Sequence, residues 1–198
     1  KIAHISKTIE LNESFCHTID VQGKIVTPGF IDQHVHITGG GGQQGYASLV
    51  PEVTMSELVA CGTTTVLGML GTDGFAKELT TLYAKAKAID DDGLSAYMLT
   101  SYYGLPTKTL MNSVADDLIF IDKVIGCKLA MSDDRSPFPT EQEILRIIHQ
   151  VRLGGFTSGK GGILHIHLGA LPEGIEPLLN IARHYPTLIS YLSPTHLI

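Results

Sequence analysis

The chain has 198 residues, of which 43% are hydrophobic and 21 are glycine, and its formal net charge is −6. This composition is typical of a globular α/β protein with many tight loops. The negative charge and the lack of basic clusters argue against binding to nucleic acid or a membrane surface, and no apolar run is long enough to span a membrane. Cys16, Cys61 and Cys127 lack paired spacing, which favours free thiols and a cytoplasmic location.

Short apolar runs alternate with helical patterns along most of the chain. The predicted strands are residues 29–36, 63–70, 95–100, 126–131, 162–168 and 188–193. The predicted helices are residues 54–60, 74–89, 114–124, 141–151 and 172–184. Thr140 and Glu143 form a capping-box sequence at the start of the fourth helix. This alternation indicates an α/β fold in which parallel strands are buried on both faces.

The number of β/α units indicates part of a barrel. Six units are fewer than the eight that close a TIM-like (β/α)8 barrel. Residues 1–27 carry short β-like pieces, at 1–5 and 24–26, that match no barrel unit. We therefore predict that residues 1–27 are part of a small β domain. Residues 28–198 would form the N-terminal three-quarters of a barrel whose C-terminal remainder lies outside this chain.

His34 and His36 end the first predicted strand and precede the glycines 39–42. Residues two apart in a strand share a face, so both imidazoles project together. Two neutral imidazoles at an open strand end could hold a divalent metal, although a His-x-His pair alone is weak evidence.

Other strand ends carry further side chains with a suitable nitrogen. Lys128 lies in the fourth predicted strand, His165 and His167 end the fifth, and His196 follows the sixth. Barrel active sites are built at these strand ends. Packing alone is a poor explanation for such side chains at four of the six ends.

Lys128 is unusual because an ammonium is costly to bury in an apolar strand without a partner. It could reach solvent or pair with a carboxylate such as Asp133. Alternatively, its neutral amine could react with carbon dioxide to give a carbamate, an anionic ligand whose two oxygens can bridge two metals. The neighbouring histidines favour the carbamate.

The motifs around these residues resemble a known family. Residues 28–36, the mid-barrel lysine and the later histidines resemble the amidohydrolase superfamily, whose members hold a binuclear metal centre. The resemblance to the isoaspartyl dipeptidase family is closer still and spans roughly residues 22–198. The segments that carry it are residues 34–42, 70–73, 98–100, 124–128, 132–136 and 194–196. The glycine run and the block from 128 to 136 narrow the choice to this family of metal-dependent hydrolases.

The resemblance implies two divalent metal ions with these ligands: His34 and His36 for the more buried ion, His167 and His196 for the more exposed ion, and carbamylated Lys128 bridging both. We expect zinc, although such ligands also suit cobalt, manganese or iron. His165 would be a core residue or a donor to a ligand, with direct ligation as the alternative. The family's remaining metal-bound residue is an aspartate at the end of strand eight that shuttles the proton, and it lies beyond residue 198.

The resemblance also implies hydrolysis of the amide bond of β-aspartyl (isoaspartyl) dipeptides by a metal-bridging hydroxide. Tyr103 would hydrogen-bond the developing oxyanion, with neighbouring Tyr102 as an alternative. Thr72 and the backbone around Gly41 would bind the aspartyl α-carboxylate. Arg135 would bind the carboxylate of the leaving residue, unless it only pairs with an adjacent aspartate at 133 or 134.

Gln43 departs from the family pattern, which has a glutamate here that pairs with the α-ammonium of the substrate. An amide can accept a hydrogen bond but lacks the charge that a buried ammonium needs. Another acid could compensate, the substrate could lack the ammonium, or the chain could be a divergent member.

Two other functions stay open. One is hydrolysis of cyclic amides, as in dihydroorotases or hydantoinases, and the other is a non-catalytic, amidohydrolase-like scaffold. For the leading function we expect a homo-oligomer that binds small peptides. Residues 154–160 match the first seven positions of a phosphate-binding loop, but Gly161 replaces Ser or Thr and the order is helix, loop, strand. We interpret that stretch as a glycine-rich turn.

Overall fold

The computed structural model describes residues 2–10 and 15–196. Its strands are β1 (Phe30–Val35), β2 (Thr63–Gly68), β3 (Ser95–Ser101), β4 (Val124–Met131), β5 (Ile163–Leu168) and β6 (Leu192–Thr195). Its α-helices are α1 (Met55–Ala60), α2 (Leu79–Asp91), α3 (Val114–Phe120), α4 (Glu141–Ser158) and α5 (Glu176–His184). Short 3-10 helices are η2 (Tyr46–Ser48), η3 (Thr72–Phe75) and η4 (Pro186–Tyr191).

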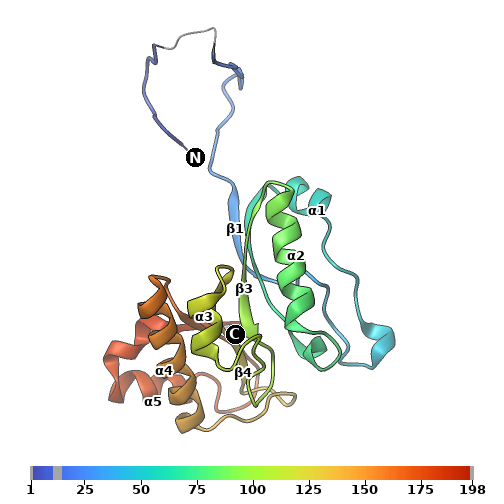
Figure 1. Ribbon diagram of the computed structural model, residues 1–198, viewed down its shortest axis with the longest axis vertical. Coiled ribbons are helices and arrows are strands. Elements are labelled where there is room, and N and C mark those ends of the chain that lie inside the picture. Colours follow the sequence, from blue (N-terminus) through green and yellow to red (C-terminus); the bar gives the residue numbers. More distant parts are fainter. Residues whose placement is uncertain (1, 11–14, 197–198) are drawn as a thin grey trace.

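The six strands form one parallel sheet in the order β1-β2-β3-β4-β5-β6. Each connection between neighbouring strands passes through a helix, and the helices lie outside the curled sheet (Figure 1). This arrangement confirms the predicted fold class, a TIM-like barrel truncated to six β/α units. Because all the strands run in the same direction, their carboxyl ends meet at one edge of the sheet.

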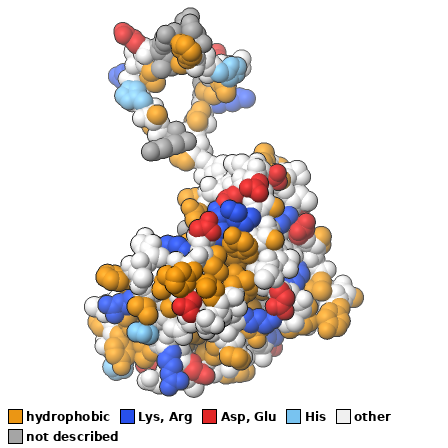
Figure 2. Space-filling view, viewed as in Figure 1, with side chains coloured by type: hydrophobic (Ala, Val, Ile, Leu, Met, Phe, Trp, Pro, Cys, Tyr) orange, Lys and Arg blue, Asp and Glu red, His pale blue; other side chains and the backbone are white. Residues whose placement is uncertain are grey.

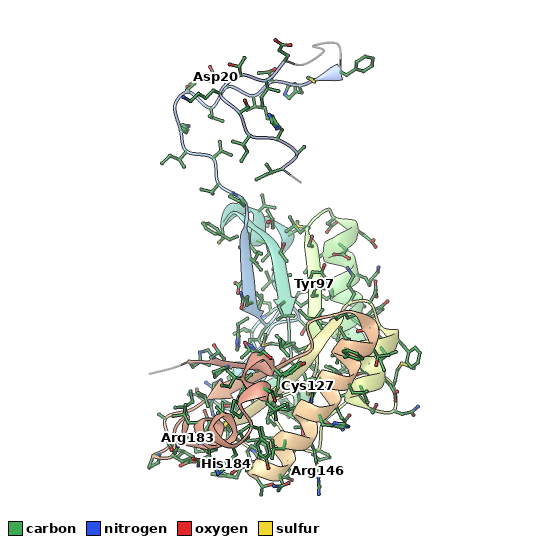
Figure 3. The ribbon with its side chains drawn as sticks, turned by 90° about the vertical axis from the view of Figure 1, so that its left-hand side faces the viewer. Asp20, Tyr97, Cys127, Arg146, Arg183 and His184 are labelled. Atoms are coloured by element: carbon green, nitrogen blue, oxygen red, sulfur yellow. The ribbon has the colours of Figure 1, made fainter. Side chains whose placement is uncertain are left out.

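Two hydrophobic clusters lie on opposite faces of the sheet. The larger one joins strands to helices and contains Cys127 of β4 and Ile148 of α4. Cys127 lies inside this layer, whereas Arg146 and Arg183 lie on the outer, exposed side of α4 and α5 (Figure 3). The smaller cluster contains only strand and strand-end residues, around Leu99, and lies on the face that the helices leave uncovered.

Helix α4 begins as predicted but is longer. Thr140 and Glu143 form the expected capping box. The helix continues to Ser158, so the interpretation of residues 154–158 as a turn is wrong. A Cβ atom on Gly154 would lie 2.7 Å from Leu118 Cβ, which shows that glycine lets α4 pack closely on α3. The helix ends at Gly159, which adopts a left-handed φ of 71°.

Other element boundaries also differ from the prediction. The sixth strand begins at Leu192 instead of residue 188, because residues 186–191 form η4 with proline in its first turn. Helix α3 ends at Phe120, and Val124 already belongs to β4. Helices α2 and α5 begin at Leu79 and Glu176, four or five residues after their predicted starts at 74 and 172.

The N-terminal segment contains no strand within its described residues, 2–10 and 15–29. The β-like pieces at 1–5 and 24–26 form no strand in their described residues, and residue 1 lies outside those residues. A strand needs a partner, and this segment stands away from the sheet (Figure 1), with Ile25 92% exposed. Figure 2 shows hydrophobic side chains of the segment open to solvent. Its assignment to a small β domain stays a prediction.

Within the described residues, no helix has both the length and the hydrophobicity that crossing a bilayer requires.

Candidate active site

A cavity of about 300 Å³ opens at the carboxyl ends of the strands. All ten residues predicted as site residues line it, together with Gly71: His34, His36, Gly41, Gln43, Thr72, Tyr103, Lys128, Arg135, His167 and His196. They come from all six strands or from the segments that follow them. The parallel sheet thus brings together side chains as much as 162 positions apart in sequence, between His34 and His196.

The four predicted histidine ligands lie next to one another in this cavity. The ring centroids of His34 and His36 are 5.4 Å apart, and those of His34 and His196 are 4.9 Å apart. His167 and His196 are separated by 4.7 Å. In the part of the chain that the structure describes, no three His, Cys, Asp or Glu side chains already form a metal site. The ligand roles therefore stay predictions.

Lys128 is 1% exposed, and its Nζ atom has no hydrogen-bond partner among the described residues. The alternative pairing with Asp133 is wrong, because that carboxylate contacts Arg135 and His167 instead. Burial lowers the pKa of Lys128 to about 7. A neutral amine is the form that can react with carbon dioxide. Lys128 Nζ and the equally unpartnered His36 Nδ1 therefore fit a metal-binding role.

His165 supports His34 from outside the cavity lining. His165 Nε2 and His34 Nδ1 are 2.9 Å apart, and His165 Nδ1 lies 3.0 Å from Ser193 Oγ. Burial, followed by the charge of Lys128, lowers the pKa of His34 to about 2 and that of His165 to about 3. Both rings are therefore neutral, and His165 lies where a donor to a ligand is expected.

Gly71 was not among the predicted site residues. A Cβ atom there would lie 2.5 Å from Cε1 of His36, so only glycine leaves room for this imidazole. The signal available in the sequence was its position within residues 70–73, a stretch that resembles the isoaspartyl dipeptidases.

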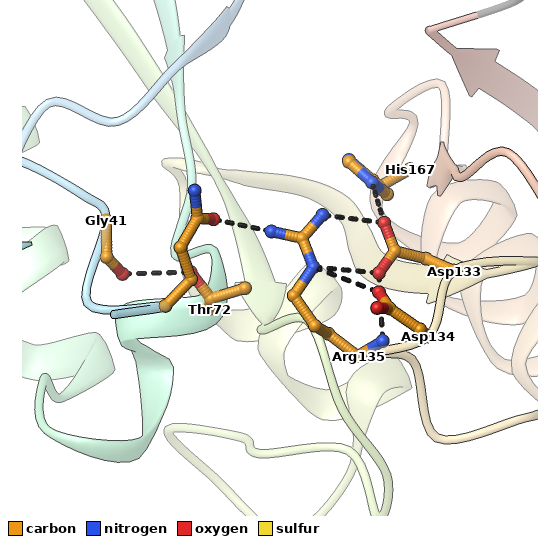
Figure 4. Close-up of polar contacts among 7 residues, drawn as sticks. Gly41, Thr72, Asp133, Asp134, Arg135 and His167 are labelled. Atoms are coloured by element: carbon orange, nitrogen blue, oxygen red, sulfur yellow. Dashed lines mark hydrogen bonds and ion pairs between the residues drawn. The ribbon is translucent and has the colours of Figure 1, made fainter. Parts of the chain in front are cut away.

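Arg135 is the centre of a polar network at the cavity rim (Figure 4). Its Nη2 and Nε atoms donate to the two oxygens of Asp133 at 2.7 and 2.8 Å, and its Nη1 atom donates to Gln43 Oε1 at 2.5 Å. Asp133 Oδ2 also lies 3.0 Å from His167 Nε2. Hydrogen bonds from Arg135 are the main reason that the pKa of Asp133 lies well below its usual range. From the sequence, Asp133 was expected only to pair with Lys128 or Arg135.

Of the two adjacent tyrosines, only Tyr103 lines the histidine cavity. Its ring centroid is 4.8 Å from that of His167, and its buried hydroxyl has no partner among the described residues. Burial raises the pKa of Tyr103, so the phenol keeps its proton and can donate a hydrogen bond. Tyr102 instead lines a neighbouring cavity of about 320 Å³. Thr72 Oγ1 donates to Gly41 O at 2.8 Å, which links the two groups predicted to bind the α-carboxylate.

Solved structures identify what this arrangement resembles. The crystal structure of beta-aspartyl dipeptidase from the thermophilic, keratin-degrading Fervidobacterium islandicum AW-1 aligns with 47% sequence identity and a TM-score of 0.83. The predicted resemblance is confirmed. The alignment covers 85% of this chain but only 46% of the dipeptidase chain. A second structure of the beta-aspartyl dipeptidase, in complex with the dipeptide β-Asp-Leu, aligns with the same identity, TM-score and coverage.

A more distant relative belongs to the same superfamily as the beta-aspartyl dipeptidases. Imidazolonepropionase of Ruegeria sp. (strain TM1040) is 31% identical over 100 residues, which are 49% of this chain and 25% of that protein. No family model matches the chain. The chain thus spans less than half the length of these relatives, and the activity of the whole protein is a matter for proposal.

Proposed function

We propose that the protein containing this chain hydrolyses the amide bond of β-aspartyl dipeptides. The observation that carries the proposal is the convergence of all ten predicted residues on one cavity. The 47% identity to beta-aspartyl dipeptidases, one of them in complex with β-Asp-Leu, supports the same substrate class.

The proposed cofactor is a pair of zinc ions. His34 and His36 would hold one ion, His167 and His196 the other, and carbamylated Lys128 would bridge them. Two bound divalent metals supply an activated water nucleophile and polarise the carbonyl that it attacks. The unpartnered Lys128 Nζ and His36 Nδ1 support this assignment, because buried polar atoms normally have a partner.

The chain's own side chains would orient the substrate. The Tyr103 hydroxyl would donate a hydrogen bond to the carbonyl oxygen as negative charge develops there. The Arg135 guanidinium would bind the carboxylate of the leaving residue. Thr72 would donate a hydrogen bond to the aspartyl α-carboxylate in place of the Gly41 carbonyl that now accepts it.

An assay on the complete, zinc-loaded protein tests the proposal. We expect hydrolysis of β-Asp-Leu, no hydrolysis of the α-linked isomer Asp-Leu, and about two zinc ions per chain by mass spectrometry. Turnover of dihydroorotate or hydantoin alone would reject the dipeptidase function. Far less than one metal per chain after zinc is supplied would favour the non-catalytic scaffold.

Cyclic-amide hydrolysis is the second candidate, and Gln43 favours it. Its side-chain oxygen already accepts from Arg135, and the side chain carries no charge to bind a free α-ammonium. A ring amide lacks that ammonium. The partial match to imidazolonepropionase is compatible with this candidate but covers only half of the chain.

We also propose a cytoplasmic homo-oligomer in which residues 1–27 contribute to a small β domain. Free Cys16, Cys61 and Cys127 support a reducing compartment. Size-exclusion chromatography with light scattering of the complete protein tests the oligomeric state.

A further inference from the structure

We propose that Asp133 is a positioning residue that fixes the imidazole of His167 and the guanidinium of Arg135 at the same time. Asp133 would thereby couple the more exposed metal position to Arg135, which would bind the carboxylate of the leaving residue. The metal half of this inference rests on the donor set described above, and the substrate half rests on the proposed function.

Both oxygens of the Asp133 carboxylate are engaged (Figure 4). Oδ1 accepts from the backbone N and from Nε of Arg135, at 2.9 and 2.8 Å. Oδ2 accepts from Arg135 Nη2 at 2.7 Å and lies 3.0 Å from His167 Nε2. The side chain is only 7% exposed, so water competes little for these contacts. One carboxylate therefore connects residues that follow β4 to a residue of β5.

The contact with His167 selects the atom that can bind a metal. An ionised carboxylate only accepts hydrogen bonds, so the proton of the neutral imidazole lies on Nε2. The lone pair is then on Nδ1, which is the nitrogen left for a metal. Histidine ligands usually donate their other N–H to a carboxylate or carbonyl, which fixes both the tautomer and the orientation of the ring. Asp133 would supply this second contact for His167.

The contact with Arg135 determines which donors a substrate can use. A guanidinium has five N–H donors. The N–H on Nε and one N–H on Nη2 donate to Asp133, and one N–H on Nη1 donates to Gln43. One N–H on each of Nη1 and Nη2 is left for a carboxylate. Because Asp133 binds one edge of the Arg135 guanidinium, the plane of this group is fixed before the substrate binds. This preorganisation lowers the entropic cost of binding the leaving residue.

Asp134 provides a matched control for this role. It is adjacent in sequence, carries the same charge and lies 3.6 Å from Nε of the same arginine, yet its side chain is 85% exposed. It does not line the cavity. Asp134→Asn therefore makes the same chemical change as Asp133→Asn without touching His167.

The main experiment measures zinc affinity in the complete protein by competition with a chelator of known affinity. Because Arg135 donates to both oxygens, Asp133→Asn turns an amide N–H toward Arg135 in either orientation of the side chain. When that N–H replaces Oδ2 it also faces His167, and in the other orientation His167 keeps only a neutral acceptor in place of a carboxylate. We expect the weaker-bound zinc to lose about 10- to 100-fold in affinity. Asp134→Asn should stay within about twofold of wild type. Asp133→Glu, which keeps the charge and both acceptors, should recover part of the loss.

A second measurement separates the two contacts. With zinc saturating, Asp133→Asn should raise the KM for β-Asp-Leu by roughly 10-fold. Arg135→Gln should raise KM as well but leave zinc affinity within about twofold, because it does not remove the acceptor for His167. Circular dichroism checks that each variant is folded, and Asp133→Glu carries the test if Asp133→Asn is not.

Three results would overturn the inference: unchanged zinc affinity in folded Asp133→Asn, an equal loss in Asp134→Asn, or an equal loss in Arg135→Gln. An unchanged KM in zinc-saturated Asp133→Asn would overturn the coupling to the substrate. If the wild-type protein binds zinc but cleaves no β-aspartyl dipeptide, the proposed function and the substrate half fail together. The zinc comparison still decides the link between Asp133 and His167.

Discussion

Two lysine amines, one in the cavity and one beside the helices, have very different surroundings. Lys160 precedes β5, and its Nζ atom donates to the carbonyls of Leu118, Ile121 and Val124 at 2.6, 2.5 and 3.1 Å. These carbonyls lie where α3 ends and β4 begins. Lys128 lies in the middle of β4 with no partner for its Nζ. An amine whose hydrogen bonds are satisfied, as in Lys160, stabilises the fold, whereas a buried amine without a partner, as in Lys128, indicates a missing ligand or modification.

Lys128→Met is the variant with the largest expected effect on activity. Without the bridging ligand, kcat/KM for β-Asp-Leu should fall at least roughly 10³-fold, and bound zinc should fall with it. The metal-free variant should be as stable as metal-free wild type or about 1 kcal/mol more stable, because an unpaired buried amine is replaced by an apolar side chain of similar length. Urea unfolding and zinc analysis measure the two effects. A marked loss of metal-free stability would contradict the comparison.

Lys160→Met makes the same substitution in the helical layer and should have the opposite effect. Three carbonyls lose a charged donor, so we expect a loss of about 2 kcal/mol in the free energy of unfolding. The loss is this small because Lys160 is partly exposed, so water can replace part of the lost contacts. Zinc content and kcat/KM at a temperature where the variant is folded should match wild type. A loss of zinc with full stability would show that the two regions are not separate.

Gln43→Glu sharpens the comparison inside the cavity, where a change of charge should alter specificity. The carboxylate supplies a counter-charge for a free α-ammonium, so kcat/KM for β-Asp-Leu should rise by about 10-fold. N-acetyl-β-Asp-Leu lacks the ammonium and serves as the matched substrate, for which no rise is expected. An equal rise for both substrates would mean that the substitution acts through its contact with Arg135.

Thr140→Ala should give the smallest effect, confined to the helical layer. The Thr140 side chain accepts a hydrogen bond from the backbone N–H of Glu143 at the start of α4. Removing such an N-cap costs about 1 kcal/mol of stability. Thermal unfolding should detect the change, while kcat/KM stays within error of wild type. A larger change in kcat/KM than in stability would assign this helix start to the site.

The site was more predictable than the boundaries of the elements that carry it. His34, Lys128 and His167 lie in predicted parallel strands, and strand periodicity shows which residues share a face. Barrel sites are built at the carboxyl ends of such strands, so these side chains could be expected to meet. The helix ends depend on contacts that one sequence does not show. Gly154 belongs to a glycine-rich stretch that is typical of a turn, yet it lies inside α4, where α3 packs closely against it.

Two other features could not be predicted, because they depend on tertiary partners. Asp133 could have paired with Lys128 or Arg135, and only the folded loop after β4 selects Arg135 and His167. The segment around Ile25 has a β-like pattern but finds no strand to pair with among the described residues. Backbone pairing is non-local, so pattern alone does not create a strand.

The most direct test of the central claim is a crystal structure of the complete, zinc-loaded protein with data collected at the zinc absorption edge. We expect two anomalous peaks between the cavity histidines, together with density for a carboxyl group on Nζ of Lys128. A bare amine at Lys128, with no anomalous peak near His34, His36, His167 and His196, would contradict it.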